Sequence, residues 1–169
     1  MSYRIGLDLG GTKVLGVVTD SDHKVIHRKK HRLSNRADIS AVMDQTSNVY
    51  TSLTEQAGDE EIASVGIALP SPVDNELGHA KHLTAFQEKE LPVRDMLKER
   101  TGVDVKLGND VNMATLAEYK FGAGKGVSSL FTFYPGTGLG GGYIYKGKLV
   151  TGFNSTAAEV GHVVIAIDG

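Results

Sequence analysis

The chain has 169 residues, of which 40% are hydrophobic and 22% are charged, a composition typical of folded globular proteins. Its 18 Lys and Arg are nearly balanced by 20 Asp and Glu, and this net charge of -2 argues against a nucleic-acid-binding surface. The absence of cysteine excludes disulfides and thiolate metal sites within these residues. Because no signal peptide and no apolar membrane-spanning segment stand out, we expect a cytoplasmic protein without a membrane partner.

The N-terminal part of the chain predicts three strands followed by a helix. Hydrophobic patterning, interrupted by glycine and Ser-Asp turns, places the strands at residues 3–9, 13–20 and 23–32. The third strand contains the basic run His27–Arg32, which could bind phosphate polymers but which we interpret as a solvent-exposed edge strand. Apolar residues at helical spacing then predict a helix, with Asp38 as its N-cap and Gly58 as its stop signal.

The middle of the chain predicts alternating strands and helices. A continuous apolar run at residues 63–69 predicts a buried strand, followed by an irregular stretch and a helix that begins at Pro92. A strand at residues 103–107 and a helix at residues 110–121 come next. Three strands followed by helix, strand, helix, strand and helix is the order of a ribonuclease-H-like domain of the actin and hexokinase type. We therefore predict an α/β fold with a mixed five-stranded sheet and flanking helices.

The C-terminal part repeats the beginning of the chain. After a glycine-rich joint at residues 122–127, strands near residues 130–133 and 143–145 enclose a glycine cluster with a threonine, as the first two strands do. We predict an N-terminal ribonuclease-H-like domain at residues 1–122 and the first strands of a second, similar and incomplete domain at residues 123–169.

The first candidate site is the segment DLGGTK, in the turn after the first strand. Gly10 and Gly11 would expose backbone N–H groups and Thr12 adds a hydroxyl donor, a combination that suits phosphate oxygens. We include Lys13 in this phosphate site, and Asp8 would hold Mg²⁺. An ordinary hairpin turn is the alternative interpretation.

The second candidate site is the glycine cluster between residues 135 and 142. Gly136, Thr137 and Gly138 could form a second phosphate-binding turn in the second domain. A glycine-rich hinge is the alternative.

Two further pairs of polar residues are candidates for substrate binding. Asn109 and Asp110 lie where a strand ends and a helix begins, and a carboxylate there stays ionised, so that it can orient a sugar hydroxyl and accept its proton. Helix capping is the alternative for this pair. Glu159 and His162 are three residues apart and could face one ligand in a helical or sharply turned segment, whereas a buried histidine bonded to the backbone is the alternative.

Five segments of the chain resemble, in order and spacing, the sugar kinases of the ROK family (repressor, open reading frame, kinase). These segments are DLGGTKVLGVV, IALPSPVD, GNDVNMATLAEYKFGAGKG, PGTGLGGGYIYKGKLVTG and AAEVGHVVI. The resemblance covers nearly the whole chain and implies transfer of a phosphoryl group from ATP, with Mg²⁺, to a hexose hydroxyl. Glucose is the default substrate, and fructose, mannose and N-acetylated hexosamines are alternatives.

The resemblance also implies roles for individual residues. It assigns the two glycine turns to phosphate binding, Asp110 to the general base, and Asn109, Glu159 and His162 to the sugar hydroxyls. His162 also matches a zinc-ligand histidine of the family, whose cysteine partners would lie downstream of this sequence.

The chain departs from the family pattern at three places on the sugar side. Ser71, which we count among the sugar-binding candidates, replaces a usual glycine, and Ala158 replaces a glycine before Glu159. The segment at residues 82–87 lacks the family's Asn-Leu pair followed by tryptophan. These differences leave the identity of the hexose open.

Two other functional classes remain as alternatives. ROK regulators keep the sugar site but carry a helix-turn-helix module in front, whereas here the first strand begins almost at Met1. A non-catalytic sugar-binding fragment is the second alternative. We expect a homodimer, and no nucleic-acid partner.

Overall fold

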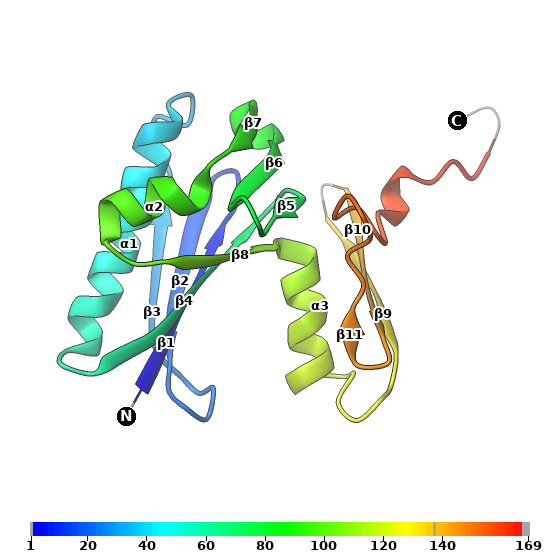
Figure 1. The fold of residues 1–169 in the computed structure, drawn as a ribbon, viewed down its shortest axis with the longest axis horizontal. Helices are drawn as coiled ribbons and strands as arrows, with labels where there is room; N and C mark the ends of the chain where they lie inside the picture. Colours follow the sequence, from blue (N-terminus) through cyan, green and yellow to red (C-terminus); the bar gives the residue numbers. More distant parts are fainter. Residues whose placement is uncertain (1, 137, 167–169) are drawn as a thin grey trace. The chain divides into compact units, whose positions relative to one another are not determined.

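The computed structural model describes residues 2–136 and 138–166. Contacts within the chain divide it into two compact units, residues 1–109 and 110–169. The sequence placed the domain boundary later, at residue 122. The division falls earlier because the helix α3 (Asp110–Phe121) packs against the strand β10 (Leu139–Tyr145) of the second unit (Figure 1).

The first unit is built on a mixed five-stranded sheet, as predicted. Its strand order is β3-β2-β1-β4-β8. The central strand β1 pairs antiparallel with β2 and parallel with β4, and β4 pairs parallel with β8. The strands are β1 (Ser2–Leu9), β2 (Lys13–Thr19), β3 (Val25–Arg32), β4 (Glu61–Leu69) and β8 (Val105–Asn109).

Two helices cover one face of this sheet. They are α1 (Ile39–Ala57) and α2 (Val93–Thr101), and both lie in front of the strands in Figure 1. The predicted N-cap is confirmed, because the Asp38 carboxylate accepts hydrogen bonds from the N–H groups of Ser40 (2.9 Å) and Ala41 (3.2 Å). α1 ends at Gly58, whose φ of 66° favours glycine.

None of the helices in residues 2–136 and 138–166 is long and apolar enough to cross a bilayer.

A small second sheet replaces the irregular stretch that the sequence predicted after β4. It contains β5 (Val73–Asp74), β6 (His79–Leu83) and β7 (Glu88–Leu91) in the order β5-β6-β7, with the 3₁₀ helix η1 (Thr84–Phe86) before β7. Strands this short show too few alternations to be recognised in a sequence. Their apolar residues nevertheless join the main core, whose fully buried large side chains are Leu9, Val14, Val18, Val42, Met43, Val49, Leu53, Leu69, Leu83, Val93 and Leu97.

The second unit consists of α3 and a three-stranded antiparallel sheet of order β11-β10-β9. Its further elements are β9 (Leu130–Pro135), β11 (Lys148–Leu149) and the 3₁₀ helix η2 (Val160–His162). Thr115 of α3 contacts Thr132 of β9 and leaves room only for glycine at Gly142. The predicted strands near residues 130–133 and 143–145 are confirmed.

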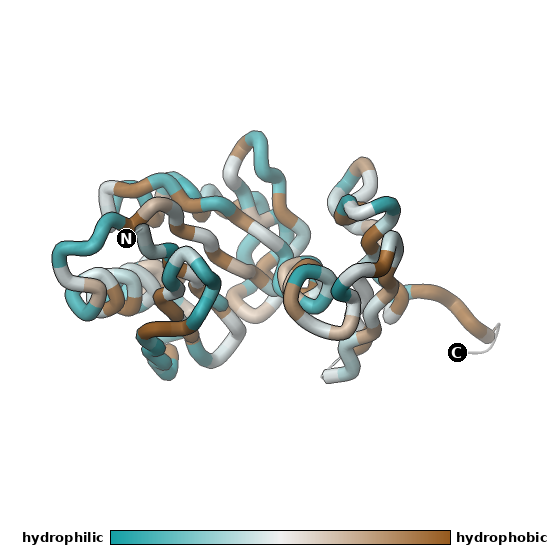
Figure 2. Tube along the Cα trace, turned by 90° about the horizontal axis from the view of Figure 1, so that it is seen from below, coloured by the Kyte–Doolittle hydropathy of each residue, from teal (hydrophilic) through white to brown (hydrophobic). Residues whose placement is uncertain are grey.

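The other face of this sheet carries a row of aromatic rings. Phe131 lies 4.9 Å from Phe133 and 5.8 Å from Tyr143, measured between ring centroids, and Tyr143 lies 6.1 Å from Tyr145. Phe133 is 62% exposed. The segment at residues 163–165 is also apolar and exposed, and it forms the brown stretch near the C-terminus in Figure 2.

Gly16 allows α1 to pack closely on β2, and this predicts a large effect of a small substitution. A Cβ atom at Gly16 would lie 2.5 Å from Leu53 Cδ1 and 2.9 Å from Val49 Cγ1. We expect Gly16→Ala to lower the free energy of unfolding by about 1–3 kcal/mol, measured by urea denaturation followed by circular dichroism. Gly66→Ala is the matched control in the same sheet, because its Cβ would meet nothing closer than the Lys106 carbonyl oxygen at 3.7 Å. Equal losses in both variants would contradict this account.

Candidate functional site

Hydrogen bonds to its carbonyl groups hold the turn between β1 and β2 in place. The N–H of Gly10 donates to the Lys13 carbonyl at 2.9 Å, which closes the turn. The Arg36 guanidinium donates to the Gly11 carbonyl at 2.9 Å, and the N–H of Leu33 donates to the Thr12 carbonyl at 3.0 Å. The loop after β3 therefore fixes the turn. The sequence analysis did not identify Arg36, since a single arginine in a polar loop gives no distinctive pattern.

The donor groups of the same turn remain available to a ligand. Neither the N–H groups of Gly11 and Thr12 nor the Thr12 hydroxyl donates a hydrogen bond to any residue that the structure describes. Thr12 and Lys13 are solvent-exposed. Free N–H groups in a tight turn, beside a hydroxyl and an ammonium group, form an arrangement suited to phosphate oxygens.

Packing requires glycine at one of the two glycine positions of this turn but not at the other. A Cβ at Gly11 would lie 2.8 Å from the Cβ of Ala85 in η1, so packing against the small sheet requires glycine there. A Cβ at Gly10 would meet its nearest neighbour at 3.6 Å, an ordinary contact. Packing therefore does not explain Gly10, whereas close approach of a phosphate to the backbone, as the sequence predicted, would explain it.

Asp8 lies one residue before the end of β1, next to this turn. Its carboxyl is accessible to solvent, but the surrounding protein atoms partly desolvate it and raise its pKa above the ordinary aspartate value, while the positive charge of Lys13 acts in the opposite direction. A bound cation stabilises the ionised form of a carboxyl group that is partly desolvated. Asp8 thus fits the predicted role of a Mg²⁺ ligand when the ion arrives with nucleotide phosphates.

Ser71 and Asn109 meet at the ends of β4 and β8. Ser71 is 2% exposed, and its hydroxyl donates to the Pro72 carbonyl at 2.7 Å and accepts from the N–H of His82 at 2.9 Å. The Asn109 side-chain amide donates to the Ser71 carbonyl at 3.4 Å. The Ser71 hydroxyl therefore ties its loop to β6, and its contact with sugar stays a prediction.

Asp110 is the first residue of α3. Its Oδ1 accepts a hydrogen bond from the N–H of Val111 at 2.8 Å, and the residue is half-buried. An acidic group in the first turn of a helix is stabilised in its ionised form by the free N–H groups there. The contact with Val111 joins adjacent residues, whereas a capping side chain accepts from an N–H two or three residues later, so both capping and a role as a base stay predictions.

The second glycine turn joins β9 to β10. The N–H of Gly136 donates to the Gly138 carbonyl at 2.8 Å, and Thr137 lies outside the described residues. A Cβ at Gly136 would meet nothing closer than 3.9 Å, and at Gly138 nothing within 4 Å. Packing therefore does not demand these two glycines, as at Gly10.

The remaining glycines of the cluster have a packing role. At Gly140 a Cβ would lie 2.7 Å from Val111 Cγ2, and Gly141 and Gly142 would collide with Ala158 and Thr115. The number of glycines in this cluster is thus a weaker sign of phosphate binding than the sequence suggested.

Glu159 and His162 lie at the two ends of η2. The N–H of His162 donates to the Glu159 carbonyl at 3.1 Å, so the segment is sharply turned, which was the condition for the two residues to face one ligand. The shared ligand itself stays a prediction. Glu159 is half-buried and His162 is exposed. The alternative interpretation of His162 as a buried histidine bonded to the backbone is therefore wrong. No group of three or more His, Asp or Glu among residues 2–136 and 138–166 is arranged to hold a metal ion, and a zinc role for His162 stays a prediction that needs ligands outside these residues.

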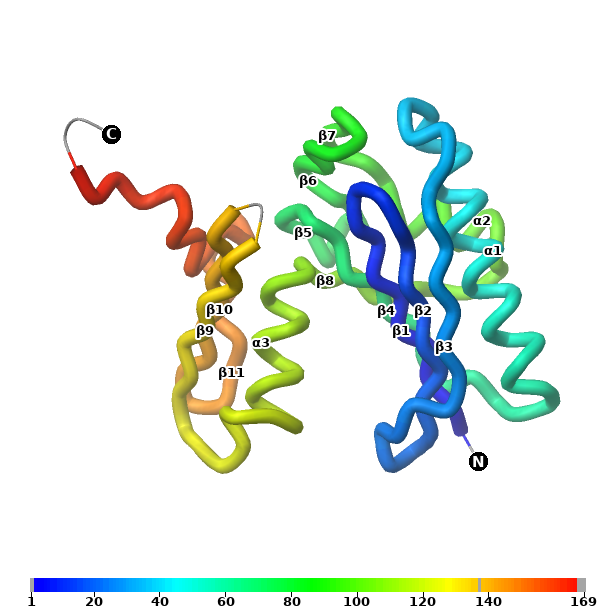
Figure 3. Tube along the Cα trace, turned by 180° about the vertical axis from the view of Figure 1, so that it is seen from behind, coloured from blue at the N-terminus to red at the C-terminus, as the bar shows by residue number. Residues whose placement is uncertain are grey.

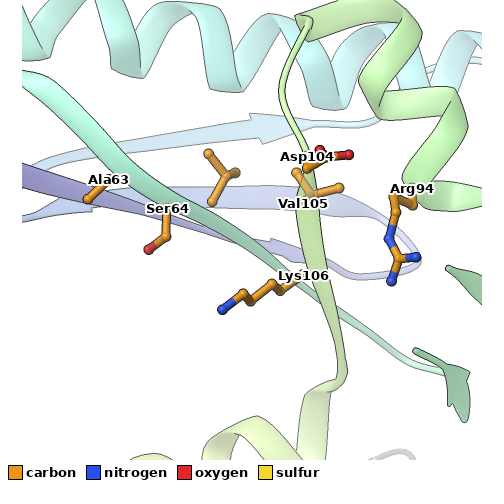
Figure 4. Close-up of a pocket in the computed structure, with 7 residues that line it drawn as sticks. Ala63, Ser64, Arg94, Asp104, Val105 and Lys106 are labelled. Carbon is orange, nitrogen blue, oxygen red and sulfur yellow. The ribbon is translucent and has the colours of Figure 1, made fainter. Parts of the chain in front are cut away.

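A separate cavity lies beside the paired strands β4 and β8. It has a volume of about 390 Å³ and is lined by residues of β4, β8 and α2, with Ser64, Lys106 and Arg94 contributing polar groups (Figure 4). The Arg94 guanidinium already donates to the carbonyls of Asn75 (2.6 Å) and Glu76 (3.2 Å). None of the predicted site residues lines this cavity, and we assign it no function.

The sequence as a whole matches one family. The sequence model of the ROK family matches residues 4–169. The chain belongs to the ROK family. It is 31% identical over 169 residues to a glucokinase of Streptomyces coelicolor and 35% identical over 166 residues to a glucokinase of Thermotoga maritima. These matches cover 100% and 98% of this chain but 52% and 51% of the two glucokinases, so the chain spans about half the length of these relatives.

A solved ROK structure confirms the predicted fold class. The ROK glucokinase of Streptomyces griseus, solved in complex with glucose and AMPPNP, superposes with a TM-score of 0.86 at 30% identity. The match covers 99% of this chain and 52% of that one. The mixed sheet with its flanking helices is thus the kinase fold of the actin and hexokinase type.

The backbone conformation of Ala158, the residue before Glu159, leads to a prediction about stability. Ala158 has a φ of 66°, in the left-handed region that favours glycine. We expect Ala158→Gly to raise the free energy of unfolding by about 0.5–1 kcal/mol, because relief of backbone strain exceeds the entropy cost of glycine. The control is Ala157→Gly, which removes a methyl group at a residue outside the positive-φ set and should lower stability. Thermal unfolding by circular dichroism compares the two, and a loss in both variants would argue against strain at Ala158.

Because the pKa of Asp8 is raised in the folded chain, we expect the substitution Asp8→Asn to stabilise the fold, and the gain to depend on pH. Below the ordinary aspartate pKa the carboxyl is neutral in both folded and unfolded chains, so Asp8→Asn should change the melting temperature little. As the pH rises through the raised pKa of the folded chain, the native carboxylate carries a desolvation cost that asparagine does not. The variant should therefore melt higher at pH 7 than the original chain. A variant that is less stable at pH 7 would show that the Asp8 charge is favourably placed in the fold.

Proposed function

We propose that the protein to which this chain belongs transfers the γ-phosphoryl group of ATP to a hydroxyl of a hexose. The observation that carries this proposal is the turn directly after Asp8, whose carbonyls are bound within the fold. In contrast, the N–H groups of Gly11 and Thr12 and the Thr12 hydroxyl donate to no described residue. A structural hairpin turn needs no such division of donors and acceptors. Membership of the ROK family and the similarity to glucokinases support the same reaction.

The phosphate-binding residues stabilise charge during the transfer. The free N–H groups of the first turn, with Thr12 and Lys13, bind oxygens of the nucleotide phosphates, and Asp8 holds the Mg²⁺ ion that neutralises part of their charge. Gly136 and Gly138 supply a second backbone surface for the phosphates. These contacts cost no reorganisation in the transition state, because the turn is already fixed by Arg36 and Leu33.

Asp110 is the proposed general base. As the oxygen of the hexose hydroxyl forms its bond to the γ-phosphorus, the bond from that phosphorus to the bridging oxygen breaks, and ADP leaves. The hydroxyl proton passes to the Asp110 carboxylate, late in a loose transition state. Asn109, Glu159 and His162 bind the other sugar hydroxyls, with Ser71 at the sugar-side loop.

Glucose is the proposed substrate, since the two relatives described above are glucokinases. Fructose, mannose and N-acetylated hexosamines remain substrates to compare. A homodimer in the cytoplasm is part of the same proposal. A ROK regulator or a sugar-binding fragment would bind the hexose without transferring phosphate.

The direct test is an ATP- and Mg²⁺-dependent phosphorylation assay with a panel of hexoses. We expect Asp110→Asn to lower kcat by at least about 100-fold, since it removes the base, with little change in the affinity for the sugar. Asp104→Asn is the matched control, because Asp104 is an exposed aspartate that pairs with Lys98 at 2.9 Å. Stabilisation by a hexose without turnover would favour the regulator or the binding fragment, and equal activity in both variants would exclude Asp110 as the base.

A further inference from the structure

Another cavity of the first unit lies beside the turn after β1. It has a volume of about 410 Å³, which is within the range typical of small-molecule sites. Its lining consists of Arg36, Ala37, Ala85, Phe86, Gln87 and Glu88. Two segments contribute these residues, the loop between β3 and α1 and the stretch from η1 to the first residue of β7, and Figure 3 shows the turn after β1 between them. None of the candidate site residues lines this cavity, so it belongs to neither the proposed sugar site nor the proposed phosphate site.

Arg36 brings a positive charge with unused hydrogen-bond donors to the cavity. A guanidinium group carries five N–H donors, and the side chain of Arg36 makes one hydrogen bond to a described residue, from Nη1 to the Gly11 carbonyl at 2.9 Å. No carboxylate among the described residues forms an ion pair with it. A ligand carboxylate could therefore accept two of the remaining N–H groups, in the bidentate geometry that arginine favours, while the bond to Gly11 stays in place.

Glu88 brings a negative charge to the same cavity. It is half-buried at the start of β7, and its carboxylate forms no ion pair and no hydrogen bond with a residue that the structure describes. Arg36 and Glu88 thus line one cavity with opposite charges that do not pair with each other. A cationic group of a ligand would find its partner in Glu88, as an anionic group would in Arg36.

The rest of the lining is largely apolar. Phe86 belongs to the main core and is only 6% exposed, so it forms a fixed wall of the cavity. Ala37 and Ala85 add methyl groups, and Gln87 adds a side-chain amide. A lining with one cation, one carboxylate and apolar carbon has no net charge, which does not suit a multiply charged phosphate. It suits a small molecule that carries both charges on an apolar body.

We propose that this cavity binds a small amino acid in its zwitterionic form. The ligand carboxylate pairs with Arg36, the ammonium group pairs with Glu88, and an apolar side chain lies against Phe86. Each charge of the ligand meets an opposite charge that the fold leaves without a partner among the described residues. The proposal concerns a site outside the sugar and phosphate sites, and it does not depend on the ATP-dependent transfer proposed above.

The first test changes the charges of the ligand. Titration calorimetry of the 169-residue chain should show binding of L-leucine. L-Leucine methyl ester lacks the carboxylate and N-acetyl-L-leucine lacks the ammonium group, and each should bind about 10-fold more weakly or worse, because each loses a charge-assisted hydrogen bond. Undiminished binding of the ester would mean a site for amines, and undiminished binding of the N-acetyl derivative a site for simple carboxylates. Either result, or no binding of L-leucine, would overturn the proposal.

The second test compares two glutamates of the same strand. Glu88 and Glu90 both belong to β7, but only Glu88 lines the cavity. The affinity for L-leucine should fall about 10-fold or more in Glu88→Gln and change little in Glu90→Gln, with circular dichroism as the check of folding. Equal affinities in the two variants would contradict the role of Glu88. Arg36 is a less selective position, since its substitution also removes the bond to the Gly11 carbonyl.

A competition experiment separates this site from the proposed sugar site. The affinity for L-leucine should be the same with and without saturating glucose, and competition between the two would place L-leucine in the sugar site and overturn the proposal. Glu88→Gln should retain ATP-dependent hexose phosphorylation in the absence of L-leucine, because Glu88 lies outside the proposed catalytic site. Binding of L-leucine by a chain that transfers no phosphate would support this site and count against the proposed function alone, so the two failures are distinguishable.

Discussion

The position of β1 at the centre of the main sheet is the constraint on which the candidate site depends. The strand is hydrogen-bonded to β2 on one side and to β4 on the other, so its register is fixed twice. Asp8 and the turn that follows therefore have one place in the fold. Arg36 and Leu33 then bind the carbonyls of the turn, and this orientation leaves the opposite N–H groups for a ligand. A polar turn at the end of a buried strand thus becomes a rigid set of donors.

The glycines of the chain serve two separate purposes, which only the structure distinguishes. Gly16, Gly140 and Gly142 allow a helix to approach a strand, and a side chain at any of them would enter its neighbour. Gly10, Gly136 and Gly138 have space for a side chain and no positive φ. Packing does not account for glycine at these three positions, and the proposal that the two turns bind phosphate would account for it by close approach of the ligand to the backbone. A count of glycines in the sequence cannot separate those that close packing requires from those that it does not.

Much of the first unit could be predicted because its signals are local. The three initial strands, the N-cap at Asp38 and the strand at β4 follow from alternation, capping and a continuous apolar run. The small sheet β5-β6-β7 was missed because its hydrogen bonds join strands too short to show a period. The candidate site residues were predicted from their motifs, whereas the contacts of Arg36 and Ser71 were not, since those contacts join segments distant in the sequence. The exposure of His162 likewise depends on how η2 lies on β10.

The row of aromatic rings on β9 and β10 affects how the chain behaves toward small apolar molecules. Environment-sensitive dyes fluoresce when they find apolar surface, which most folded proteins expose only on melting. Here Phe131, Phe133 and Tyr145 offer such surface in the native state. The sequence has no tryptophan whose emission could report unfolding in place of a dye. Native-state dye fluorescence should therefore be high, and it should fall when polar residues replace these rings, even though the backbone remains folded.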